Sequence, residues 1–209
     1  MNYLSKYIET LDLIETNIVK IKIKTDKVSV KCSGTLLAIT LDHAQGIKFC
    51  LKNKSYPSAF SLLRVLFESY IRGMWLGKCA NTKQLDEYIN NDKLVSKNSK
   101  KISFGDMVLE VESKHELPKY LSKIKDNTWD GLNSLTHSGS IQLHRNFNGK
   151  SITHCYEDEH IDEAIQFATM LSCMAFAGLC DLATSTDGKV EFDQIAKFVQ
   201  SWAFNESSD

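Results

Sequence analysis

Three charged side chains interrupt the most apolar stretch of the chain. Arg64, Glu68 and Arg72 follow one another at four-residue steps within residues 59–76, which are otherwise dominated by Leu, Phe, Ile, Met and Trp. Four-residue steps place side chains along one stripe of a helix. Because a carboxylate between two guanidinium groups can pair with both, such a stripe is tolerated beside a core. It predicts either a structural seam that fixes the helix register or, with one positive charge in excess, an anion-binding wall.

A second group of reactive side chains lies further along the chain. His137 precedes the small residues Ser138 and Gly139, and His144 and Arg145 are adjacent. Histidine exchanges a proton near neutral pH, and arginine keeps its charge and holds phosphate groups. Cleavage of a phosphodiester without a metal needs both abilities, so His137, His144 and Arg145 are candidate catalytic residues. Each histidine taken alone is also consistent with a capping or hydrogen-bonding role.

The sequence lacks the motifs of several large enzyme classes. It contains no G-x-G-x-x-G or Walker A phosphate loop, no G-x-S-x-G nucleophile turn and no H-E-x-x-H zinc motif. Its six cysteines include no C-x-x-C pair, which argues against a structural zinc site. We therefore predict no metal and no cofactor.

Helical periodicity dominates the segments that must position these residues. The second expected helix starts with Asp26 as its N-cap and ends near Asn53. It carries His43, a further candidate binding residue, because a mid-helix histidine can hydrogen-bond into the interior. The third expected helix starts at Pro57, since proline fits a first helical turn. Helices are expected over 4–18, 26–53, 57–78, 82–91, 103–113, 117–125, 127–136, 157–185 and 190–204.

These elements predict a single all-α domain over residues 1–209. Four to five long helices form the bundle, and residues 82–126 form a helical insertion. Within the insertion, residues 92–101 are polar and basic without periodicity, which is typical of a mobile surface loop. The alternative is a phosphate-contacting loop, in which several lysines converge on an anion: Lys93, Lys97, Lys100 and Lys101.

The overall charge excludes a broad polyanion-binding surface. With 25 basic and 26 acidic residues, the formal net charge is −1, so any polyanion site must be local. The first ten residues lack the apolar region of a signal peptide, and we expect free thiols in a reducing cytoplasm. Residues 164–180 carry no formal charge but are shorter than the roughly 20 residues of a membrane span. We expect a buried central helix there and no membrane partner.

Three stretches of the sequence carry a family resemblance: Leu63-Arg64…Glu68…Arg72-Gly73-Met74-Trp75-Leu76, Leu37-Ala38…Asp42-His43-Ala44…Ile47, and Trp129…Leu132-Asn133…Thr136-His137-Ser138-Gly139…Gln142…Arg145. They resemble a family of uncharacterised bacterial helical proteins. That family is distantly similar to HEPN-type helical bundles, which include RNA-cleaving toxins and phage-defence proteins. The resemblance implies a HEPN-like fold, an RNA or nucleotide partner, and a metal-independent ribonuclease-type site.

The chain departs from the catalytic signature of those ribonucleases. In that signature a histidine follows an arginine and a polar residue, four to six positions after the arginine. Arg145-Asn146 begins the pattern, but the next histidine is His154, nine positions on. No histidine follows Arg64 or Arg72 in range. A site in this chain must therefore be assembled from separate segments.

Two other functions fit the same residues. The first is a non-catalytic interaction module, in which the arginine–glutamate stripe is structural and the helices form a homodimer or bind another partner. The second is a sensor that binds a small anion between helices. An open cleft between the stripe and residues 137–145 favours catalysis, whereas a stripe sealed by apolar neighbours excludes it.

Overall fold

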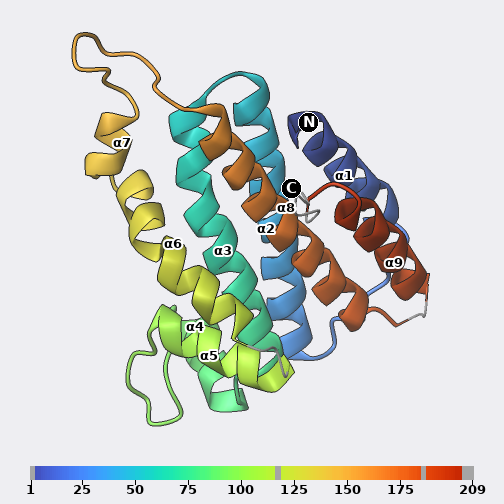
Figure 1. Cartoon of the computed structure of the whole chain (residues 1–209). Helices are drawn as coiled ribbons and strands as arrows, with labels where there is room; N and C mark the ends of the chain where they lie inside the picture. Colours follow the sequence, from blue (N-terminus) through green and yellow to red (C-terminus); the bar gives the residue numbers. More distant parts are fainter. Residues whose placement is uncertain (1–2, 116–118, 185–186, 204–209) are drawn as a thin grey trace.

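The computed structural model describes residues 3–115, 119–184 and 187–203, which form helices joined by loops (Figure 1). Over these ranges the β-structure is limited to three isolated bridges. The prediction of an all-α fold is confirmed. The helices are α1 (Tyr3–Ile18), α2 (Val28–Lys52), α3 (Tyr56–Lys78), α4 (Thr82–Asn91), α5 (Phe104–His115), α6 (Tyr120–Thr136), α7 (Ser140–His144), α8 (Asp158–Leu182) and α9 (Asp187–Gln200).

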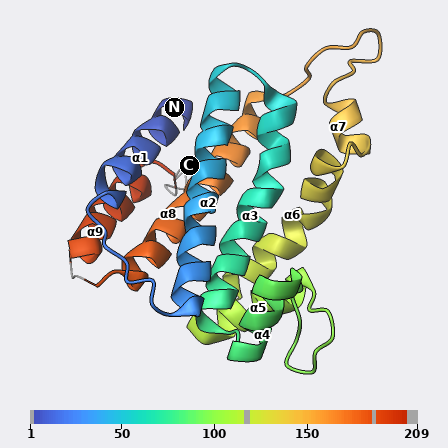
Figure 2. The same ribbon diagram turned by 180° about the vertical axis from the view of Figure 1, so that it is seen from behind.

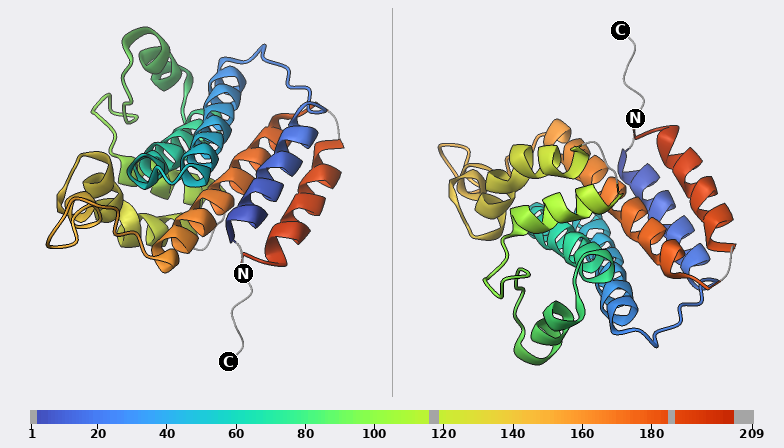
Figure 3. Two further views of the ribbon diagram at one scale, coloured as in Figure 1. Left: turned by 90° about the horizontal axis from the view of Figure 1, so that it is seen from above. Right: turned by 90° about the horizontal axis from the view of Figure 1, so that it is seen from below.

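Helix α3 lies in the middle of the molecule. Figure 2 shows it side by side with α2, and α8 packs against both helices. On the far side of α8, α1 and α9 complete one end of the bundle, while α6 covers the opposite side of α3 (Figure 3). Helices α4 and α5 lie at the C-terminal end of α3, and α7 with the loop that follows lies near its N-terminal end.

Close packing between α2, α3 and α8 buries the apolar side chains of α3. Leu66, Ile71 and Trp75 are fully buried. Gly178 of α8 faces Leu37 of α2 so closely that an added Cβ would lie 2.8 Å from the leucine Cδ1. Glycine at this position therefore allows the two helices to approach, and burial of the apolar side chains between them stabilises the fold.

Helix α8 is the long apolar helix expected near residues 164–180. By length and composition it is the one described helix that could cross a membrane, and half of its most apolar window is buried within the protein. It packs against α1, α2, α3 and α9. Central helices of soluble bundles share these properties.

Two details of the expected helices are wrong. Residues 120–136 form one continuous helix, α6, because Asp126 and Asn127 lie on its exposed side while Leu121 and Leu132 face the interior. The N-cap of α2 is Lys27, without a side-chain hydrogen bond, so Asp26 does not cap that helix.

The basic loop between α4 and α5 forms a hydrogen-bonded turn. Val95 and Lys101 make an antiparallel bridge, and the Ile102 amide donates to the Leu94 carbonyl over 3.1 Å. Val95 and Ile102 are buried, and the side-chain amide of the buried Gln84 donates to the Val95 carbonyl over 2.8 Å. These contacts hold the loop against the end of the bundle beside α3.

Candidate functional site

The charged stripe of α3 is a paired network at the boundary between core and solvent. Glu68 accepts from Arg64 Nη2 through one carboxylate oxygen over 2.8 Å and pairs with Arg72 Nη2 through the other over 3.2 Å. The side chains of Arg64 and Glu68 are 19% and 14% exposed, whereas that of Arg72 is 38% exposed. One carboxylate thus serves two guanidinium groups, and the stripe keeps one positive charge in excess.

His137 of the α6 C-terminus joins this network. Its Nε2 contacts Nη1 of Arg64, and its backbone amide donates to the Asn133 carbonyl as the C-cap of α6. A guanidinium group only donates hydrogen bonds, so the ring nitrogen that faces it must be the acceptor. The contact places a proton-exchanging group beside a permanent cation.

The turn after α6 fixes the direction of His137. Ser138 has a positive φ of 56°, and Gly139 passes so close to Ser134 that an added Cβ would lie 2.4 Å from the serine Oγ. The same Oγ accepts from the Ile141 amide over 3.1 Å. On α3, Ser61 Oγ donates to the Leu135 carbonyl over 2.9 Å. The small residues after the histidine thus fold the turn back onto α6, and Ser61 ties the end of α6 to α3.

Aromatic rings cover the stripe from the side of α6. The Arg64 guanidinium lies 5.1 Å from the ring centre of Trp129. Trp129 stacks on Phe104 at 4.2 Å with an interplanar angle of 11°. Cations over aromatic faces are held by the ring quadrupole. The stripe is therefore shielded near Arg64 and open near Arg72, an arrangement between the two extremes that the sequence left open.

A groove of about 880 Å³ opens beside Arg72. Its walls come from the α4–α5 loop, α5 and α6, and they include Lys93, Lys101 and Trp129. This volume lies within the range of small-molecule sites in proteins. The groove is the concave surface that lies next to the charged stripe.

Arg145 lies at the other end of the stripe, at the C-cap of α7. Its guanidinium is 4.9 Å from the ring centre of Phe60 and 5.6 Å from that of Tyr156. Phe60 precedes Arg64 by four residues, so Arg145 contacts α3 one turn before the stripe begins. Burial raises the pKa of the Tyr156 hydroxyl, while its hydrogen bond with Asn146 and the charge of Arg145 lower it.

The structure brings four of the seven predicted site residues into one network: Arg64, Glu68, Arg72 and His137. Arg145 stands one helical turn away. His144 is exposed, and its side chain makes no hydrogen bond or ion pair within the described ranges. His43 is half-buried on α2, away from the network, and burial lowers its pKa although Asp42 raises it.

Sequence reasoning missed the aromatic residues of the site and one compositional signal. The chain contains three arginines among its 25 basic residues: two belong to the stripe of α3, and Arg145 contacts Phe60 one turn before the stripe. Each also has one buried nitrogen, Nε of Arg64 and Arg72 and Nη1 of Arg145, without an acceptor in the described part of the chain. The concentration of arginine against a background of lysine would have been visible in the sequence.

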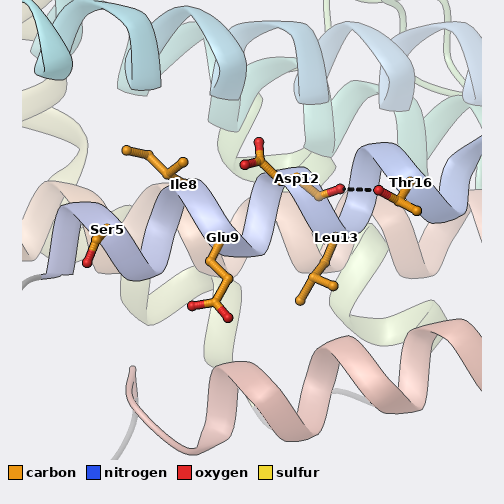
Figure 4. Close-up of a pocket in the computed structure, with 6 residues that line it drawn as sticks. All are labelled: Ser5, Ile8, Glu9, Asp12, Leu13 and Thr16. Atoms are coloured by element: carbon orange, nitrogen blue, oxygen red, sulfur yellow. Dashed lines mark hydrogen bonds between the residues drawn. The ribbon is translucent and has the colours of Figure 1, made fainter.

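A hollow on α1 offers no comparable chemistry (Figure 4). Its two carboxylates, Glu9 and Asp12, point away from each other, and they pair with Lys6 over 3.0 Å and with Lys48 over 3.2 Å. Within residues 3–115, 119–184 and 187–203, no three His, Cys, Asp or Glu side chains are grouped to hold a metal ion.

Comparison with known protein families assigns most of the chain to one of them. A family model described as a family of unknown function (DUF6988) covers residues 37–201. No curated protein and no solved structure gives a significant match. The matched region includes the whole stripe of α3, the groove beside Arg72, and His137.

Proposed function

The chain belongs to the DUF6988 family, whose function is unknown, and we propose that it is a HEPN-like protein that acts on RNA through a metal-independent, ribonuclease-type site. The site comprises Arg64, Glu68, Arg72 and His137, with Arg145 one helical turn away along α3. The proposal adds His144, the neighbour of Arg145 in the chain. The proposal includes a role as a bacterial toxin or phage-defence component, as in the helical families that the sequence resembles.

The contact between His137 and Arg64 is the observation that carries this proposal. It joins a group that can exchange a proton to a cation that can hold a phosphate. Three arginines lie in order beside α3. Arg145 contacts it at Phe60, and Arg64 and then Arg72 follow on the helix itself, up to the groove. A row of cations suits a chain of phosphates better than a single small anion.

In the proposed reaction, a phosphate of RNA replaces His137 as the partner of Arg64 Nη1. Nε2 of His137 is then free to accept the proton of the neighbouring ribose 2′-hydroxyl. The O2′–P bond forms, the P–O5′ bond breaks, and His144 donates a proton to the leaving 5′ oxygen. Arg64 stabilises the negative charge that develops on the phosphate oxygens. The products carry a 2′,3′-cyclic phosphate and a 5′-hydroxyl.

Incubation of the purified protein with total RNA in the presence of a chelator tests the proposal. We expect cleavage by the wild type and a loss of about a hundredfold or more in His137→Ala and Arg64→Ala, as for removal of an acid–base group or of a charge-stabilising group. Lys31→Ala, which removes an exposed positive charge from α2, should retain wild-type activity. Absence of cleavage, or equal cleavage by all variants, overturns the proposal.

The second candidate is an interaction module that forms a homodimer. Leu143, Phe147 and Ile152 are 61%, 44% and 91% exposed, and they line a groove of about 750 Å³ between α7 and the loop that follows. Exposed apolar clusters of this kind mark protein contacts. Light scattering of the wild type and of Ile152→Lys tests it. A dimer that dissociates in the variant favours this candidate, and a monomeric wild type excludes it.

A further inference from the structure

The groove beside Arg72 has an apolar wall and a cationic rim. The wall includes the stacked pair Phe104 and Trp129, and the rim carries Lys93 and Lys101, which are both exposed. A planar apolar group with an attached anion is the chemistry that such a site recognises.

The charges around the groove favour a phosphate. Arg72, Lys93 and Lys101 carry three positive charges, whereas Asp92 and Glu68, which pairs with Arg72, carry two negative charges. The local charge is therefore +1. The lysine ammonium groups make no ion pair within the described residues, and Arg72 pairs with Glu68 through Nη2 alone. A phosphate can therefore take hydrogen bonds from the two lysines and from Nη1 of Arg72 without breaking an existing ion pair.

We propose that this groove binds one nucleotide of the RNA substrate, with its phosphate at Arg72, Lys93 and Lys101 and its base against the wall that contains Phe104 and Trp129. The identity of the substrate as RNA rests on the function proposed above. Glu68 bonds both Arg72 and Arg64, so the groove adjoins the proposed site of cleavage. A bound nucleotide would place the next phosphate of the chain toward Arg64 and His137.

Titration with adenosine 5′-monophosphate, followed by tryptophan fluorescence, tests the proposal without any cleavage step. Trp75 and Trp202 are buried, whereas Trp129 lines the groove. A base packed against the groove side of the Phe104–Trp129 pair is therefore expected to quench Trp129. We expect saturable quenching in the wild type and none in Trp129→Phe. Inorganic phosphate should compete only at concentrations about tenfold higher or more, because it lacks the base.

The matched control comes from the same loop. In Lys93→Ala/Lys101→Ala the dissociation constant should rise about tenfold or more, since two charge-assisted hydrogen bonds are lost. Lys97→Ala/Lys100→Ala removes the same charge from side chains that do not line the groove, and its constant should change less than about twofold. All four lysines are exposed, so both variants are expected to fold.

Several outcomes would overturn the groove proposal: no saturable quenching in the wild type, full quenching in Trp129→Phe, equal weakening in the two lysine pairs, or phosphate that competes as well as the nucleotide. The proposed function fails separately, through absent or His137-independent RNA cleavage. Nucleotide binding without cleavage would leave the groove proposal standing and replace the ribonuclease by a nucleotide-binding module.

Discussion

The two sides of α3 hold the helix in place by different physical means. Toward α2 and α8 the contact is apolar and close, with Gly73 against Leu37 and Met74 against Gly178. The side toward α6 carries the ion pairs that Glu68 makes within α3. Across to α6, Arg64 contacts His137 and Ser61 donates to the Leu135 carbonyl. The apolar side removes surface from water, whereas the charged side must replace the hydration of its charges with protein partners.

The difference indicates which side of α3 contributes more to the stability of the fold. A partly enclosed ion network offsets much of its desolvation cost and contributes little net stability compared with apolar residues of similar size. On the charged side, Arg64 and Arg72 each have a buried Nε without an acceptor in the described residues. Retention of such groups is typical of binding and catalytic sites, where stability is lost in exchange for function. The comparison leads to four predictions.

The largest loss of stability is expected on the apolar side. Leu37→Ala removes a fully buried side chain that fills the space between Gly73 and Gly178. The free energy of unfolding should fall by about 2–5 kcal/mol, because transfer and cavity terms add. Urea denaturation measures this loss, and a change below about 1 kcal/mol would show that α2, α3 and α8 are not closely packed.

A smaller loss is expected when the charged network is broken. Glu68→Gln removes the carboxylate charge that Arg64 and Arg72 share. We expect the free energy of unfolding to fall by about 1–2 kcal/mol. This is less than for a fully buried pair, because all three side chains retain some exposure to water. The same urea measurement applies, and a loss as large as that of Leu37→Ala would contradict the distinction between the two sides.

Replacing all three charged residues of the stripe with apolar ones should lower the free energy of unfolding less than removing the charge of Glu68 alone. In the triple variant Arg64→Met/Glu68→Leu/Arg72→Met, the free energy of unfolding should stay within about 1 kcal/mol of the wild type or rise. RNA cleavage and nucleotide binding should both be lost. A triple variant that is much less stable than Glu68→Gln would mean that the stripe is a structural seam.

The smallest effect concerns pH and lies outside the stripe. Burial lowers the pKa of His43 below its ordinary value of 6.5, so the unfolded chain binds a proton at a higher pH than the folded protein. Stability from this residue is present above pH 6.5 and falls as the pH drops through that value toward the lower folded pKa. Thermal unfolding of His43→Asn between pH 5 and 8 should lack this component. An unchanged pH dependence would show that His43 does not contribute to it.

Local sequence patterns predicted most of the helices. The contacts between distant segments that form the site could not be predicted from them. Spacing alone predicted the helix that carries Arg64, Glu68 and Arg72, because apolar periodicity is a local property. The contact between Arg64 and His137 joins residues 73 positions apart, and no local rule reports it. Trp129 was recognised only as part of a family resemblance, since its position over Arg64 depends on how α6 packs against α3.

The capping error at Asp26 has a related cause. Aspartate is a favourable N-cap in isolation, but α2 begins one residue later than an Asp26 cap requires, with Lys27 as its N-cap. The basic loop allowed two interpretations, a mobile surface loop and a phosphate-contacting loop. Which of its lysines line a groove could not be predicted from the sequence, because it depends on how the loop folds. Lys93 and Lys101 line the groove beside Arg72, whereas Lys97 and Lys100 do not.

The end groups of the RNA products are the most direct test of the central claim that His137 and Arg64 act on RNA without a metal. In the presence of a chelator, the wild-type protein should yield fragments that end in a 2′,3′-cyclic phosphate and begin with a 5′-hydroxyl. An RNA with a 2′-deoxyribose at the cleaved position should remain intact, because the attacking hydroxyl is missing. Fragments that begin with a 5′-phosphate, or RNA that the wild-type protein leaves uncut, would contradict the claim.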